Sequence, residues 1–140
     1  MANGTNEIYR ILEKRDMAAG KKQITNKGTA NAEIITVGQD QVVVLKSAWS
    51  QQSKWHTNVK TIITGQASQE LDLELIFVLD GTADAITYKQ HMLPGYRNLS
   101  VNKLFKNLRS GTHTLEIKAA ASAGTFQVDI SHCNKTISFR

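Results

Sequence analysis

The feature that most constrains this chain is a strict two-residue alternation of apolar and polar side chains, which recurs in several short runs. In residues 71–79, leucines and a phenylalanine occupy every second position, and residues 114–121 alternate in the same way with leucine, isoleucine and alanine. Successive side chains of a β-strand point to opposite faces, so each run predicts a strand with one apolar face. Such strands require a second layer to cover those faces.

A glycine-containing turn follows the second of these runs. After Ser122-Ala123-Gly124, residues 125–130 alternate again, with apolar side chains at every second position. Glycine adopts the positive φ of a tight hairpin loop without steric cost. We therefore predict that residues 114–121 and 125–130 form a β-hairpin whose apolar faces are covered by a second sheet.

The rest of the chain after residue 33 also consists of short apolar or alternating runs separated by turn signals. Asp80-Gly81 predicts a hairpin turn between the strand at 71–79 and a return strand through residues 86–92. Turn signals recur about every eight to twelve residues, which is typical of an antiparallel sandwich. We predict an all-β fold, an antiparallel β-sandwich or jelly roll of about eight or nine strands, with a short N-terminal helix and arm.

The first 31 residues have a different character from the rest. Thr5 and Asn6 can cap a short helix over residues 7–16, and residues 17–31 are rich in glycine, lysine, threonine and asparagine. The apolar stripe of this helix consists of Ile8, Ile11 and Leu12. So short a helix is marginal alone in water, so we expect it to dock on other protein. We assign residues 1–31 to a helix and linker arm for tethering or oligomerisation, and residues 32–140 to the sandwich domain.

A second candidate for subunit contact is the apolar run at residues 42–45. An uninterrupted apolar run suits a strand buried on both faces or a seam with another subunit. We include Val42 and Val44 among the oligomerisation residues.

The chain has a formal net charge of +5, from 17 basic and 12 acidic residues. Such an excess attracts polyanions over long range without identifying a nucleic-acid binder. A nucleic-acid contact through Lys103, Lys106 and Arg109 would show salt-dependent binding, but these residues interleave with apolar ones and nucleic acid is not an expected partner. No run approaches the roughly eighteen apolar residues of a membrane-spanning helix, and no secretory signal is visible, so we expect no membrane partner and synthesis in the cytosol.

The titratable residues do not form a recognisable catalytic or metal motif. The chain has no P-loop, dinucleotide fingerprint, zinc-protease or serine-hydrolase motif. The four histidines fall on separate predicted strands, and we expect His113 to be half-buried at a sheet rim. Asp72, Glu74 and Asp80 share the polar face of one predicted strand, which is ordinary for a solvated face. We predict no catalytic residue, no metal, no cofactor and no enzymatic activity. The single cysteine, Cys133, is expected to be a packed thiol.

The aromatic residues provide the candidates for ligand contact. Tyr96 follows Pro94-Gly95 and precedes Arg97, so we place it on a loop and regard it as the leading candidate for a glycan contact, together with Arg97. Trp55 and His56 are further candidates, although Trp55 is in phase with aliphatic residues and also suits the core.

The second half of the sequence resembles two groups of β-sandwich proteins. The shared positions are Leu79-Asp80-Gly81, Leu99-Ser100, Leu108, Gly111-Thr112-His113-Thr114-Leu115 and Gly124-Thr125. The pattern resembles structural and accessory proteins of tailed-phage virions, such as tail, neck, head-fibre and baseplate components. It also resembles jelly-roll carbohydrate-binding modules, in which Asp129 would lie on a late strand.

The first resemblance implies a non-enzymatic structural protein of a bacteriophage virion that docks through its N-terminal segment and displays a β-sandwich. It implies other virion proteins as partners, a homo-oligomer with a trimer favoured, a role in host adhesion, and location in the virion after synthesis in the host cytoplasm. The alternative is a lectin-like carbohydrate-binding module that contacts a cell-surface glycan.

Overall fold

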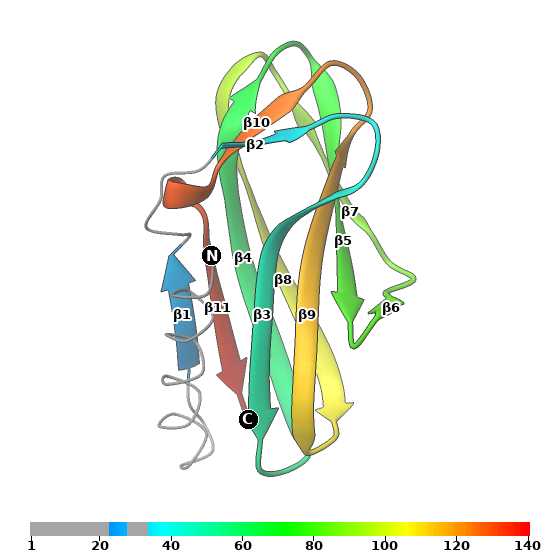
Figure 1. The fold of residues 1–140 in the computed structure, drawn as a ribbon, viewed down its shortest axis with the longest axis vertical. Helices are drawn as coiled ribbons and strands as arrows, with labels where there is room; N and C mark the ends of the chain where they lie inside the picture. Colours follow the sequence, from blue (N-terminus) through cyan, green and yellow to red (C-terminus); the bar gives the residue numbers. More distant parts are fainter. Residues whose placement is uncertain (1–22, 28–33) are drawn as a thin grey trace.

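The computed structural model of the chain describes residues 23–27 and 34–140, with side chains described from residue 34 onward. The predicted helix over residues 7–16, with Ile8, Ile11 and Leu12, lies outside the described residues. The described strands form two antiparallel sheets that pack face to face (Figure 1). The predicted fold class, an all-β antiparallel sandwich of jelly-roll type, is therefore confirmed.

The strands divide between the two sheets as follows. The six-stranded sheet, here called sheet A, contains β1 (Gln23–Lys27), β2 (Ile34–Val37), β4 (Trp55–Ala67), β8 (Gly95–Leu108), β10 (Phe126–Asp129) and β11 (Asn134–Phe139). The five-stranded sheet, sheet B, contains β3 (Val42–Gln51), β5 (Leu71–Leu79), β6 (Thr82–Ala83), β7 (Tyr88–Met92) and β9 (Gly111–Ala121). A 3-10 turn, η2 (Ile130–His132), joins β10 to β11.

The chain repeatedly crosses from one sheet to the other. The connections β3–β4, β4–β5, β7–β8, β8–β9 and β9–β10 each join strands of different sheets. These crossings take place at the two ends of the long axis of the sandwich, where Figure 1 shows the connecting turns. Each crossing keeps the apolar faces of consecutive strands on the same core. Side chains at the turns therefore gather at two ends of the sandwich, about the length of β4 apart.

The predicted hairpin of residues 114–121 and 125–130 is wrong. β9 pairs with β3 and β5, whereas β10 pairs with β2 and β4 in the other sheet. The two-residue period shows that each strand has an apolar face. Two such strands can bury their apolar faces in the same core either as a hairpin within one sheet or as neighbours in the chain that belong to opposite sheets. Gly124 has a φ of 56°, and a Cβ there would lie 2.7 Å from Ser68 Oγ, because this turn packs against the β4–β5 turn.

The predicted hairpin turn at Asp80-Gly81 is present. Both residues have positive φ, 52° and 82°, and the flanking pairs Val78↔Ala83 and Leu79↔Thr82 close a two-residue loop. The return strand β7 then pairs with the first half of β5. Because β9 pairs with its other edge, β5 is an interior strand of sheet B.

The core lies between the two sheets and follows the predicted alternation. Fully buried side chains include Val59 and Ile63 of β4, Leu73 and Phe77 of β5, and Ile117 of β9. Cys133 is buried as well, and burial raises the pKa of its thiol. Gly65 lies inside β4, and a Cβ there would approach the Gln127 carbonyl oxygen to 2.2 Å.

Two segments differ in detail from the sequence prediction. The register between β3 and β9 shifts between Val43 and Leu45, so Val44 and Leu45 are both buried although they are adjacent. Val44 thus lies in the core of its own chain, Val42 is partly buried against it, and their role in oligomerisation stays a prediction. Gln23–Lys27, within the segment assigned to the arm, forms β1 and pairs with β11.

Candidate functional site

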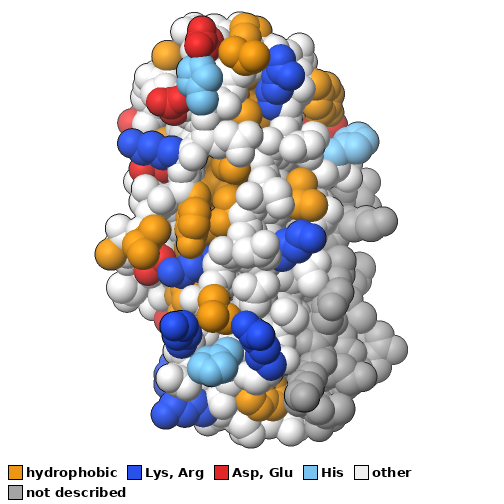
Figure 2. All heavy atoms as spheres, turned by 180° about the vertical axis from the view of Figure 1, so that it is seen from behind, with side chains coloured by type: hydrophobic (Ala, Val, Ile, Leu, Met, Phe, Trp, Pro, Cys, Tyr) orange, Lys and Arg blue, Asp and Glu red, His pale blue; other side chains and the backbone are white. Residues whose placement is uncertain are grey.

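The outer face of sheet A carries mainly uncharged polar side chains. They alternate with the buried residues of the same strands and include Asn58, Thr64, Gln66, Asn98, Ser100, Asn102, Gln127, Asn134 and Ser138. Figure 2 shows this face, with white surface over much of its middle. A sheet face rich in amides and hydroxyls offers many hydrogen-bond donors and acceptors without a net charge.

Tyr96 stands at the upper end of this face with its ring exposed. The ring is held by a hydrogen bond of 2.7 Å from its phenol oxygen to Oδ2 of Asp129, and 57% of the residue is accessible to solvent. Tyr96 lies opposite Gln66 in the β4–β8 register, and Gln66 lies opposite Gln127 of β10. The ring is therefore an oriented, exposed platform at one end of a row of amides.

Asp129 organises the cluster around this ring. Its carboxylate accepts hydrogen bonds from Ser131 Oγ at 2.7 Å and from Tyr96, and it contacts His132 Nδ1 at 2.8 Å. The hydrogen bond from Ser131, followed by that from Tyr96, lowers the pKa of Asp129 to about 2. The same carboxylate raises the pKa of the Tyr96 phenol. At neutral pH the cluster thus contains a carboxylate and an un-ionised phenol.

Ser131, His132 and Asp129 are the residue types of a hydrolase triad, but their geometry differs from one. In a triad the imidazole receives the serine proton on one nitrogen and holds the carboxylate on the other. Here both Ser131 Oγ, at 3.1 Å, and the Asp129 carboxylate contact the same atom, His132 Nδ1. The cluster orients Tyr96 and His132 and provides no path for a proton from Ser131 to Nε2. From the sequence, Asp129 could be recognised only as a late-strand residue, and neither it nor His132 could be connected with Tyr96, because 33 positions separate Tyr96 from Asp129.

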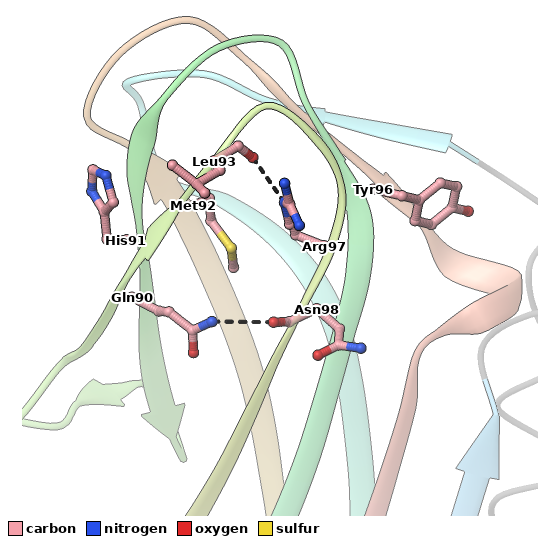
Figure 3. A pocket seen from close by; sticks show the side chains of 7 residues that line it. All are labelled: Gln90, His91, Met92, Leu93, Tyr96, Arg97 and Asn98. Atoms are coloured by element: carbon pink, nitrogen blue, oxygen red, sulfur yellow. Dashed lines mark hydrogen bonds between the residues drawn. The ribbon is translucent and has the colours of Figure 1, made fainter.

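A shallow groove of about 350 Å³ lies at the β7–β8 turn, and both Tyr96 and Arg97 are among the residues that line it. Figure 3 shows His91, Leu93 and Arg97 around it, and shows the Tyr96 ring pointing away from Arg97. Arg97 donates hydrogen bonds to the carbonyl oxygens of Leu93 at 3.2 Å and Pro94 at 3.0 Å. The guanidinium thereby ties together its own turn. Tyr96 and Arg97, which we expected to share a ligand, point to different sides because neighbouring strand residues alternate.

Trp55 and His56 lie at the opposite end of the sandwich from Tyr96. Trp55 is opposite Leu108, eleven positions along β4 from Gln66, which corresponds to roughly 35 Å. The Trp55 ring is partly buried, with its centre 5.4 Å from that of Phe139, so it packs as its sequence phase suggested. The structure therefore does not bring the four predicted glycan-contact residues into one site.

The remaining titratable candidates form separate pairs. His113, expected to be half-buried, is 1% exposed, and its Nδ1 lies 2.6 Å from Asp80. Asp80 does not share a strand face with Asp72 and Glu74, because it lies in the turn after β5. Asp72 instead contacts His91. Among the described residues, no three or more histidine, cysteine or acidic side chains converge as metal ligands. The same part of the chain has no helix that is long and apolar enough to cross a membrane.

Comparisons with known proteins support the fold and assign no family. No family model matches the sequence, and no curated protein matches it either. Among solved structures, the insecticidal delta-endotoxin Cry8Ea1 from Bacillus thuringiensis is similar, with 15% identity and a TM-score of 0.51 over 84% of this chain and 24% of the endotoxin. Eiger TNF from S. frugiperda has 8% identity and a TM-score of 0.53, over 86% of this chain and 93% of that one.

Several other solved structures are similar to this chain with lower TM-scores. A family 35 carbohydrate-binding module from an environmental isolate has 12% identity and a TM-score of 0.40, over 89% of this chain and 90% of the module. Other similar structures come from infectious bursal disease virus and from further carbohydrate-binding modules. This chain spans about a quarter of the endotoxin's length. At these identities the comparisons establish a β-sandwich and nothing about its ligand.

Proposed function

We propose that the chain is a non-enzymatic recognition module that binds a neutral glycan on the outer face of sheet A. The observation that carries this proposal is the exposed Tyr96 ring, held in one orientation by Asp129. The apolar C–H face of a sugar packs on an aromatic ring, and a ring that is already oriented loses less conformational freedom on binding. Asp129 adds a charged acceptor beside the ring for sugar hydroxyls.

The amides next to Tyr96 supply the remaining chemistry. Each asparagine or glutamine side chain offers one acceptor and two donors, which suits the hydroxyl groups of a sugar. Gln66 and Gln127 continue the row from Tyr96 across neighbouring strands, at about 4.8 Å per strand. Asn98 and Asn102 project from the same face of β8, and the described residues provide no partner for their side-chain amides. The amides of Asn98 and Asn102 are therefore free to bind a ligand, whereas Oε1 of Gln127 already accepts a hydrogen bond from Thr36 Oγ1.

A glycan array tests this proposal. The wild-type protein is expected to bind one or more neutral glycans, and Tyr96→Ala is expected to abolish that binding while the far-ultraviolet circular dichroism stays unchanged. Ile86→Ala is the matched control, because Ile86 is also a large exposed apolar residue, at 60% exposure, and lies away from the face. Arg97→Ala tests whether the groove contributes. An array without neutral hits, or a Tyr96→Ala protein that binds as the wild type does, would contradict the proposal.

We further propose that this module is a structural or accessory component of a phage virion, docked through residues 1–31. The support is the sequence resemblance together with the position of β1, which adds to the β11 edge of sheet A with Gln23 opposite Ser138. The assembly would be a homo-oligomer, with a trimer favoured, in contact with other virion proteins. Size-exclusion chromatography with light scattering tests the oligomer. A strict monomer at high concentration, unchanged when residues 1–22 are deleted, would count against it.

A further inference from the structure

The end of the sandwich opposite Tyr96 gathers cationic side chains from four separate segments. Exposed basic residues lie in the β3–β4 turn, near the end of β8, in the β8–β9 turn and after β11. Together with one histidine of β4 they form a cluster that we call the basic end. It consists of Lys54, His56, Lys106, Arg109 and Arg140. The backbones of His56 and Arg140 hydrogen-bond to each other in both directions, at 2.8 and 3.0 Å. Figure 2 shows blue side chains around a histidine at this end.

A β-bulge arranges the centre of the basic end. The β4–β8 register shifts between Trp55 and Thr57, so His56 faces an extra residue of β8, and Asn107 there has a φ of 53°. The Asn107 backbone N–H donates to Nδ1 of His56 at 3.1 Å. Since Nδ1 accepts this bond, the neutral ring carries its hydrogen on Nε2, which is then a donor without a partner among the described residues.

The positive charge of this end is not compensated within the described part of the chain. None of the ion pairs there involves Lys54, Lys106 or Arg140, and Arg109 lies 3.9 Å from Asp80, which is already bound to His113.

The described carboxylates, by contrast, almost all have partners. They bind lysine, histidine or hydroxyl groups, and the carboxylate of Asp40 is the exception. Acidic groups that are already paired are poor partners for a second copy of the chain. Partners for the basic end therefore have to come from another molecule that carries negative charge.

We propose that the basic end binds an acidic polysaccharide, as a site separate from the neutral-glycan face around Tyr96. Nucleic acid fits less well, because single strands bind by stacking bases on exposed aromatic rings, whereas the described aromatic rings at this end, Trp55, Phe105 and Phe139, all pack on the core. Lys103, which the sequence grouped with Lys106 and Arg109, instead pairs with Asp84, and its side chain is 12% exposed. Amine, guanidinium and imidazole donors from four separate segments suit carboxylate groups spaced along a sugar chain.

The experiment measures binding of the full chain to polygalacturonate by affinity electrophoresis and calorimetry. The methyl ester of the same polymer is the uncharged control, and a single-stranded oligothymidylate represents nucleic acid. Lys54→Ala/Lys106→Ala is compared with Lys89→Ala/Lys118→Ala, which removes the same charge from the outer face of sheet B. Polygalacturonate is expected to bind, with about a tenfold loss in the first variant and little change in the second. The salt dependence should also weaken in the first variant.

Several results would overturn this proposal. If the oligothymidylate binds more tightly than polygalacturonate and its binding depends on Lys54 and Lys106, the partner is nucleic acid and the proposal is wrong. Absence of polygalacturonate binding, equal binding of its methyl ester, or equal losses in the two variants would each contradict a site at the basic end. Tyr96→Ala leaves this binding unchanged, so failure here and failure of the neutral-glycan proposal are distinguishable.

Discussion

Nδ1 of His113 lies 2.6 Å from Oδ2 of Asp80, although 33 positions separate the two residues. The other ring nitrogen, Nε2, lies 2.8 Å from the carbonyl oxygen of Arg109, so it must donate. The short contact to Asp80 then needs a proton between Nδ1 and Oδ2. Asp80 also accepts the backbone N–H of Thr114 at 2.8 Å. The pair therefore joins the β5–β6 turn to β9, with the imidazole buried against Trp49.

Replacing Asp80 with asparagine is expected to lower the free energy of unfolding by about 2 kcal/mol, because a charge-assisted bond to a buried imidazole is weakened. Urea denaturation monitored by tryptophan fluorescence measures the change. Asp40→Asn is the control, since Asp40 is exposed and has no partner among the described residues, and it should change stability by less than about 0.5 kcal/mol. Equal effects of the two substitutions would show that the buried pair contributes little.

The hydrogen bonds to the Asp129 carboxylate should make the stability of the fold depend on pH in the acid range. The pKa of Asp129 is lowered from 3.8 to about 2 in the folded chain, so its contribution is present above 3.8 and is lost as the pH falls toward 2. Thermal unfolding of the wild type and of Asp129→Asn between pH 5 and about 2 measures it. The difference in melting temperature between the wild type and Asp129→Asn should shrink as the pH is lowered across this range. A difference in melting temperature that stays constant with pH would contradict the lowered pKa of Asp129.

A second pH effect is expected with the opposite sign, at His91. Hydrogen bonds to Asp72 and then to Glu70 raise the pKa of His91 above its ordinary value of 6.5. The group therefore contributes stability below 6.5, and that contribution is lost as the pH rises through the raised value. Proton NMR titration of the His91 ring measures the shift directly. Asp72→Asn should move the titration of His91 down, and an unchanged midpoint would show that the contact does not persist in solution.

Gly65→Ala is expected to destabilise the sandwich by about 3 kcal/mol, through a clash that side-chain rotation cannot relieve. A Cβ at this position would lie 2.2 Å from the Gln127 carbonyl oxygen, which is backbone of the adjacent strand β10. Gly38→Ala is the matched control, because nothing lies within 4 Å of its Cβ position. Differential scanning calorimetry of both variants measures the difference. Equal melting temperatures would show that β4 and β10 separate at little cost.

The local elements of this fold could be predicted from short stretches of sequence. The alternation in Leu71–Leu79 predicts β5, and Asp80-Gly81 predicts its turn, because both depend on side-chain period and backbone sterics within a few residues. The pairing of β9 and β10 was predicted wrongly for a related reason. Their apolar faces are visible in the sequence, but the sheet that each joins depends on strands elsewhere in the chain.

The candidate site was predictable only in part. Tyr96 could be selected as an exposed aromatic residue after Pro94-Gly95, but the carboxylate that orients its ring comes from Asp129 of β10. The basic end likewise combines turns that are distant in sequence, whereas Lys103, only three positions from Lys106, pairs instead with Asp84.

The sequence by itself determined that this chain forms strands with one apolar face each, since that property follows from the period of two and from the residues of each turn. The tertiary structure alone decided which strands pair, which of Tyr96 and Arg97 faces the amide-rich surface, and which cations meet at the basic end. The physical reason is that the hydrophobic effect stabilises any arrangement of strands that covers the apolar faces. Contacts between polar residues distant in sequence form only in the one arrangement that the packing of the whole core favours.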